Sequence, residues 1–385
     1  MGTTSGSFAL QGLNASKDAT MATLLRKAGC VVIGKSNMSV RQPSTGNPVS
    51  VTPEVLKGYR NGATRRDLAS RADGLQSETP AGSSSGGAVA VAAGFAPISI
   101  GTEADGSIVQ RAIRAALYGM KSAAWDSADV MEVLLPGRDF HSCLGRSWKG
   151  IRIALLNYEQ WQFDDEECIK TPVFDQEHKR DISHAMKAIE SLGGKVVYDA
   201  PLMMLDDVVK TYKTAEMGTI SRHQLSFVIK RYLALFDNPQ MRTLEDVVEF
   251  NKRHADVELP PEQPSQEVFE NGLKDNTTDE EYHISLDYLR RSVRETMEKL
   301  WAETGTDVIM ASGESNLTTT AAAAGYPIAS VPLGFSTFNG RPYGLEIVAR
   351  NGAEDKLFQV MSAWEATFAD ARRPPPLLEK WMTRI

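Results

Sequence analysis

Short apolar stretches alternate with helical patterns along two parts of this chain, and this alternation constrains the fold more than any other feature. Buried strands that alternate with helices predict an α/β fold, with a sheet covered by helical layers. The expected strands are residues 30–34, 97–101, 151–156, 195–198, 306–311, 328–333 and 344–348. The expected helices are residues 18–27, 87–95, 182–192, 317–324 and 354–368.

Between the two α/β stretches, the character of the sequence changes. Residues 202–304 consist mainly of charged helical patterns, and the Pro- and acid-rich residues 258–280 are expected to form a loop. The helical patterns cover residues 208–217, 222–235 and 282–303. We interpret residues 202–304 as a helical insertion or lid in a discontinuous core made of residues 1–201 and 305–385.

The composition argues against several classes of protein. A net charge of −7 and the lack of a basic stripe argue against a nucleic-acid partner. The 3 cysteines and 6 histidines are scattered, which argues against a disulfide framework and against a metal site. No apolar run is long enough to span a membrane, and the N-terminus lacks the regions of a signal peptide. We therefore expect a cytoplasmic protein without a membrane partner.

Two glycine-flanked serine motifs lie on either side of the apolar residues 88–100. The first is Pro-Ala-Gly-Ser-Ser-Ser-Gly-Gly at residues 80–87, and the second is Gly-Thr-Glu-Ala-Asp-Gly-Ser-Ile at residues 101–108. Glycines let the backbone turn tightly and present N–H groups, as an anion or oxyanion site requires. A serine in such a loop can act as a nucleophile when a base and oxyanion donors converge on it.

Other interpretations of these motifs remain open at this point. Residues 82–86 fit the G-x-S-x-G pattern of a nucleophile elbow, but the polar residues 70–80 cannot supply the buried strand that an elbow needs. Ser107 could instead be a helix N-cap or a turn residue without a chemical role. Glu103 and Asp105 could form an acid–base pair, although their place in a backbone-donor loop favours structural hydrogen bonding.

Both motifs, together with residues 325–334 and 339–345, resemble the amidase signature superfamily, and in particular its members from filamentous fungi. The resemblance covers residues 3–121 and 305–376. It implies a mixed β-sheet core flanked by helices. It also implies hydrolysis of a carboxylic amide C–N bond in a small-molecule substrate, through a seryl acyl-enzyme and without a metal or organic cofactor.

The resemblance also assigns roles to individual residues within a Ser–cis-Ser–Lys mechanism. Ser107 matches the nucleophile, Ser84 matches the bridging serine that follows a cis peptide bond, and Ser85 matches its neighbour. The backbone N–H groups that match the oxyanion loop are those of Ala104, Asp105, Gly106 and Ser107.

No lysine of this sequence lies in the sequence context that the catalytic lysine has in the family. In the family it belongs to a Lys-Asp pair after an apolar strand, upstream of the region that residues 3–9 match. Lys17 precedes an aspartate but follows polar residues, and Lys35 and Lys121 are expected to have surface or structural roles. We therefore expect either an amide hydrolase with a substitute base or an inactive amidase-fold protein that binds a small molecule or a partner.

Two further departures from the family pattern concern the region after the second motif. Arg111 and Ile113 replace a proline and a small residue, so they are expected to crowd or reshape the floor of the site. The connection through residues 118–129 is shorter than in the family, so the chain resembles a form that is truncated at its N-terminus and shortened internally. Loss of strands would expose a sheet edge, which favours a homodimer.

Overall fold

The computed structural model describes residues 3–5, 7–36, 84–123, 139–163, 171–237, 239–259, 265–337 and 340–373. Contacts between residues divide the chain into two compact units. The helical unit contains residues 1–58 and 211–288, and the sheet unit contains residues 59–210 and 289–385. The prediction that residues 202–304 form one insertion in a core of residues 1–201 and 305–385 stays a prediction.

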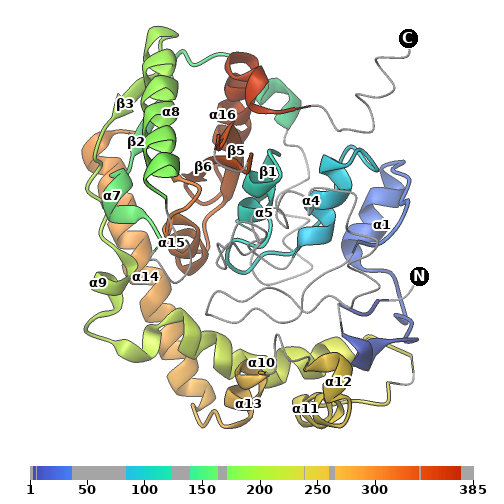
Figure 1. Ribbon diagram of the computed structural model, residues 1–385. Coiled ribbons are helices and arrows are strands. Elements are labelled where there is room, and N and C mark those ends of the chain that lie inside the picture. Colours follow the sequence, from blue (N-terminus) through green and yellow to red (C-terminus); the bar gives the residue numbers. More distant parts are fainter. Residues whose placement is uncertain are drawn as a thin grey trace, which may run out of the picture. The chain divides into compact units, whose positions relative to one another are not determined.

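A mixed sheet of six strands forms the centre of the described part of the sheet unit (Figure 1). Its spatial order is β1-β5-β6-β4-β2-β3, in which β2 runs parallel to β3 and β4 and the remaining neighbours pair antiparallel. The strands are β1 Gly119–Lys121, β2 Arg152–Leu155, β3 Lys195–Val197, β4 Val308–Ser312, β5 Ile328–Phe335 and β6 Pro342–Ala349. The predicted α/β fold with a mixed sheet is confirmed.

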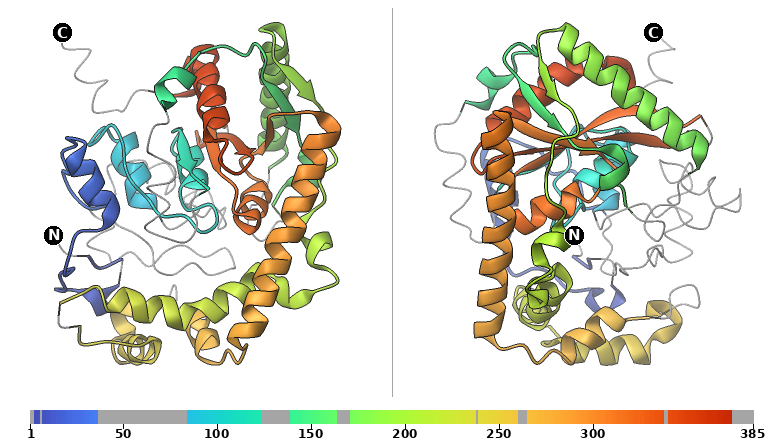
Figure 2. Two further views of the ribbon diagram at one scale, coloured as in Figure 1. Left: turned by 180° about the vertical axis from the view of Figure 1, so that it is seen from behind. Right: turned by 90° about the vertical axis from the view of Figure 1, so that its left-hand side faces the viewer.

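Helices cover both faces of this sheet (Figure 2). One face packs against α8 Pro172–Ser191 and α16 Glu354–Thr367, whose buried side chains form a single apolar core with the strands. The helices α5 Val109–Arg114 and α15 Leu317–Ala324 pack against β6. The other helices in the described part of this unit are α4 Ser85–Ala92, α7 Tyr158–Trp161, α9 Leu205–Val209, part of α14 Asp279–Thr304, η2 Phe140–Cys143 and η4 Ala369–Ala371. Because β4 and β6 are buried along their whole length, their sequences are continuously apolar apart from a few polar residues.

The helical unit has its own apolar core. Residues of η1 Phe8–Leu10, α10 Met217–Leu233, α11 Leu244–Arg253 and α13 Glu267–Leu273 meet in it. The unit also contains α1 Thr20–Lys27, η3 Lys213–Ala215, α12 Ala255–Glu258 and the beginning of α14. Thr243 and Asp246 form a capping box that fixes the start of α11.

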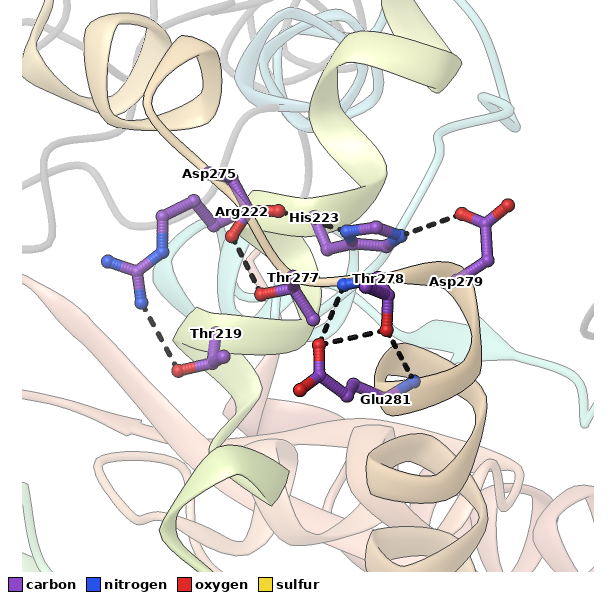
Figure 3. A network of polar contacts seen from close by, with 8 residues as sticks. All are labelled: Thr219, Arg222, His223, Asp275, Thr277, Thr278, Asp279 and Glu281. Carbon is purple, nitrogen blue, oxygen red and sulfur yellow. Dashed lines mark hydrogen bonds and ion pairs between the residues drawn. The ribbon is translucent and has the colours of Figure 1, made fainter.

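A polar network ties α10 to the segment that leads into α14 (Figure 3). His223 of α10 contacts Asp275 through Nδ1 at 2.9 Å and Asp279 through Nε2 at 3.3 Å. At the start of α14, the backbone N–H and the hydroxyl of Thr278 both donate to Glu281, whose own N–H donates to the Thr278 hydroxyl. These reciprocal bonds satisfy donors that the first turn of a helix leaves unpaired.

Most of the helix and strand predictions were correct for the described residues, with four exceptions. Residues 30–34 and 97–101 belong to no strand, and the side chains of Val31 and Ile98 are 83% and 63% exposed. An apolar run becomes a strand only where a neighbouring strand supplies hydrogen-bond partners, and the described residues supply none here. The helix predicted at residues 208–217 is interrupted by η3, and the loop predicted at residues 258–280 contains α13.

Within the described ranges, no helix is both long enough and apolar enough to cross a membrane.

Gly344 of β6 pairs with Pro332 of β5, and its replacement by alanine is expected to destabilise the sheet unit by about 2–3 kcal/mol. A Cβ at this position would lie 2.2 Å from the carbonyl oxygen of Val331, and a backbone atom cannot move aside without disturbing the ladder. Chemical denaturation measures the change. Gly218→Ala is the control, because a Cβ at that helical position meets nothing and should stabilise the protein by about 0.5–1 kcal/mol.

Candidate active site

The second glycine–serine motif forms the turn that leads into α5. Glu103 stabilises this turn, because its Oε2 accepts hydrogen bonds from the backbone N–H groups of Ile108 at 2.5 Å and Val109 at 2.8 Å. Burial raises the pKa of Glu103, and these backbone donors oppose that effect. The Glu103 carboxylate thus satisfies two N–H groups at the start of α5, as the structural interpretation expects.

Gly106 gives the turn its shape. Its φ of 73° lies in the left-handed region, and a Cβ there would lie 2.7 Å from Cγ of Gln110. The carbonyl oxygen of Gly106 accepts a hydrogen bond from the N–H of Gln110 at 3.0 Å, which joins the turn to α5. Ser107 follows directly and is buried. The tight turn therefore depends on a residue without a side chain immediately before Ser107.

Asp105 fastens the same turn to a distant helix. Thr319 of α15 donates a hydrogen bond from its hydroxyl to Oδ1 of Asp105 at 3.2 Å. The residue keeps some exposed surface, but protein atoms surround its carboxylate, and this desolvation raises the pKa of Asp105 to about 6. The hydrogen bond to Thr319 thus agrees with the expectation that Asp105 makes structural hydrogen bonds.

Ser84 lies beside this turn, at the N-cap position of α4. Its hydroxyl donates to the carbonyl oxygen of Thr102 at 2.9 Å and accepts from the N–H of Thr102 at 3.3 Å. Gly101 permits this approach, because a Cβ there would lie 3.1 Å from both Oγ of Ser84 and Cγ1 of Ile108. The two motifs therefore meet at one place in the sheet unit.

Other parts of the first motif are only partly described. Ser85 is the first residue of α4. The peptide bond expected to be cis joins residue 83 to Ser84, and residue 83 lies outside the described residues. Two residues of the G-x-S-x-G pattern, 82 and 83, also lie outside the described residues.

The three candidate lysines have different surroundings. Lys17 and Lys35 belong to the helical unit, where Lys35 donates a hydrogen bond to Thr3. Lys121 lies on β1 in the sheet unit, on the same strand face as Gly119, whose Cβ position is 3.4 Å from the carbonyl oxygen of Ile108. Burial lowers the pKa of Lys121, and the nearby carboxylates of Glu103 and Asp105 oppose that shift. Lys121 therefore places a positive charge beside the acidic residues of the turn.

A polar pair that sequence reasoning missed lies between α5 and the sheet. Gln110 donates from Nε2 to Oε1 of Glu346 at 2.6 Å, and both side chains are buried. Burial raises the pKa of Glu346 well above its ordinary value, and the nearby carboxylates of Glu103 and Asp105 add to this effect. The position of Glu346 within the apolar strand 344–348 was the signal that could have identified it.

A buried charge cluster fixes the far end of α5 and was also missed. Glu314 accepts a hydrogen bond from Nη2 of Arg114 at 2.7 Å and pairs with Arg341. Desolvation raises the pKa of Glu314, but the guanidinium groups outweigh this effect and hold the pKa at about 2. The cluster therefore carries two positive charges and one negative charge in the interior.

The two residues expected to crowd the site, Arg111 and Ile113, are both buried. Ile113 occupies space left free by Gly313 and Gly344, since a Cβ at either position would contact its side chain. Arg111 lines a cavity of about 160 Å³ beside Ser84. This cavity lies among α4, α5 and residues 97–101. Apolar and small side chains form most of its wall, including Val91, Ile98 and Leu117.

Within the described ranges, no group of three or more His, Cys, Asp or Glu side chains is arranged to hold a metal ion.

A family model and two curated relatives that match this chain are all described as amidases. The family model described as Amidase matches residues 1–126. A putative amidase of Schizosaccharomyces pombe is 26% identical, and the alignment spans 95% of this chain and 71% of that protein. A probable amidase of Arabidopsis thaliana is also 26% identical and covers 98% of this chain and 75% of its own length.

Two solved structures that resemble this chain are also amidases. Native peptide amidase from Stenotrophomonas maltophilia superposes with a TM-score of 0.76 at 27% identity, covering 97% of this chain and 81% of that chain. An amidase family protein from Bacillus anthracis superposes with a TM-score of 0.74 at 22% identity, over 97% of this chain and 76% of that one.

Proposed function

Because the chain belongs to the amidase signature superfamily, we propose that it hydrolyses a carboxylic amide C–N bond and that Ser107 is the nucleophile. The observation that carries this proposal is the meeting of the two serine motifs. Both hydrogen bonds of the Ser84 hydroxyl go to the backbone of Thr102, five residues before Ser107. A nucleophilic serine, a second hydroxyl and a turn of backbone donors are the parts that this chemistry needs.

In the proposed reaction, Oγ of Ser107 attacks the amide carbonyl carbon while its proton passes to Ser84. The backbone N–H groups of residues 104–107 hold the negative charge that develops on the carbonyl oxygen. The C–N bond then breaks, the leaving nitrogen receives the proton, and an acyl ester remains on Ser107. Water hydrolyses this ester and restores the serine. A base that accepts the proton from Ser84 completes the proton relay.

The proposed substrate is a small-molecule amide. The cavity beside Ser84 favours a substrate with an apolar substituent, because small and aliphatic side chains form most of its wall. One solved relative is a peptide amidase, so peptide amides belong among the compounds to be tested.

Hydrolysis of a panel of amides tests the proposal directly. The panel should contain aliphatic primary amides, anilides and amidated peptides, and the assay should detect the released ammonia or amine. Added hydroxylamine should divert part of the product to a hydroxamate, since it competes with water for an acyl-enzyme. A chain that unfolds cooperatively but converts no member of the panel would contradict the proposal. That result would favour the alternative of an inactive protein that binds a small molecule or a partner.

A further inference from the structure

The turn that carries Ser107 is held by contacts of two kinds. The hydrogen bonds described above for Glu103 and Gly106 go to residues 108–110, at the start of α5, which follows the turn directly in the sequence. Such local bonds preserve the shape of the turn. They do not fix its position relative to the rest of the sheet unit.

The hydrogen bond between Thr319 and Asp105 is of the second kind, because it joins residues 214 positions apart in the sequence. The helix that carries Thr319, α15, is almost entirely buried and packs against β6. It is held at its start by the N–H of Asn316, which donates to the carbonyl oxygen of Trp161 at 3.0 Å. At its end, Gly325 adopts the left-handed conformation that terminates a helix. Thr319 therefore belongs to a fixed part of the sheet unit.

The electrostatic surroundings of the Asp105 carboxylate disfavour its charged form. Three charged or titratable groups act on it, namely Glu103 in the same turn, Lys121 on β1 and Glu346 on β6. Two of these three are acidic, and desolvation raises the pKa of Asp105. A desolvated carboxylate with acidic neighbours lowers the stability of the folded protein. Such carboxylates are common at functional sites.

We propose that Asp105 and Thr319 are positioning residues, whose hydrogen bond holds the backbone N–H groups of residues 104–107 in place against α15. This inference rests on the proposed function and deepens it, because those N–H groups are the proposed oxyanion donors. The bond acts on the reaction through the backbone, and neither side chain needs to touch the substrate.

The test compares three substitutions on α15 in the full-length chain. Thr319→Val removes the donor without changing the volume, and Thr319→Ser keeps it. Thr320→Val is the matched control, since the Thr320 hydroxyl donates to the carbonyl oxygen of Asn316 within its own helix. Amide hydrogen exchange in a peptide covering residues 103–109 should become about tenfold faster in Thr319→Val, because one hydrogen bond that restrains the turn is lost. It should stay within about twofold of the parent chain in the other two variants.

Kinetics on an amide that the chain hydrolyses give a second measurement. Thr319→Val should lower kcat about tenfold and leave KM within about twofold, since it disturbs donors that act mainly in the transition state. Thr319→Ser should restore kcat. If Thr319→Val does not fold, Asp105→Ala should reproduce the faster exchange, while Asp105→Asn, which keeps an acceptor, should not.

The exchange measurement separates this inference from the proposed function, because it needs no turnover. Unchanged exchange in Thr319→Val would overturn the inference, even in an active amidase. Equal acceleration in Thr319→Val and Thr320→Val would also overturn it, since that pattern reflects general loosening of α15. Faster exchange confined to Thr319→Val supports the anchoring role, and a lack of turnover in the parent chain would then count against the proposed function alone.

Discussion

Replacement of Ser107 by alanine is expected to lower kcat/KM for amide hydrolysis by about a thousandfold or more, because it removes the atom that forms the acyl ester. The fold around residue 107 should persist. The turn is shaped by Gly106 and by the two N–H groups that donate to Glu103, and none of these depends on the Ser107 side chain. The backbone donors of the turn then remain in place and account for residual turnover.

Steady-state kinetics and thermal unfolding of the same samples test this expectation. Ser191→Ala is a suitable control, since its exposed hydroxyl only donates to the carbonyl oxygen of Ala188 at the end of α8. The control should keep full activity. A Ser107→Ala variant that retained more than about a tenth of the parent activity would exclude Ser107 as the nucleophile.

Replacement of Glu314 by glutamine is expected to destabilise the protein by about 3–5 kcal/mol, because it leaves Arg114 and Arg341 buried without a counter-charge. The side chains of all three residues are at most 7% exposed, so water cannot solvate the remaining guanidinium groups. Glutamine nearly matches glutamate in size. The change in the free energy of unfolding therefore reports mainly the lost charge.

Urea denaturation at pH 7 measures this effect, and its pH dependence gives a second check. The folded pKa of Glu314 is about 2, below the ordinary value of 4.5, so its stabilisation is fully present above pH 4.5 and is lost as the pH falls towards 2. The difference between parent and variant should thus narrow below pH 4.5. Glu249→Gln breaks an exposed ion pair with Lys252 and should cost less than about 0.5 kcal/mol. A Glu314→Gln variant as stable as this control would contradict the expectation.

The sequence was a reliable guide to elements whose ends carry local signals. The helix at residues 317–324 was predicted with the bounds observed, because an alanine-rich run there is followed by a glycine that terminates it. The strands at residues 328–333 and 344–348 were recognised from continuously apolar runs. Residues 30–34 and 97–101 carry the same apolar signal but form no strand, since strand formation also requires a pairing partner elsewhere in the chain.

The candidate site was predictable to the extent that its residues are close in sequence. The second motif identified the turn, its glycines and the residues flanking Ser107. Its supports were not predictable, because Thr319, Glu346 and Glu314 contact residues at least 200 positions earlier in the chain. A lone threonine in a helix or a glutamate in an apolar strand carries no signal of its partner.

Only some residues of the turn support its shape, and this difference has a consequence for protein engineering. Glu103, Asp105 and Gly106 each support the turn through a hydrogen bond or through a left-handed backbone. Ala104 is exposed and lies between two of these supports. Position 104 is thus the natural starting point for directed evolution of substrate scope. A saturation library there can vary the surface beside the proposed nucleophile while the scaffold of the turn is retained.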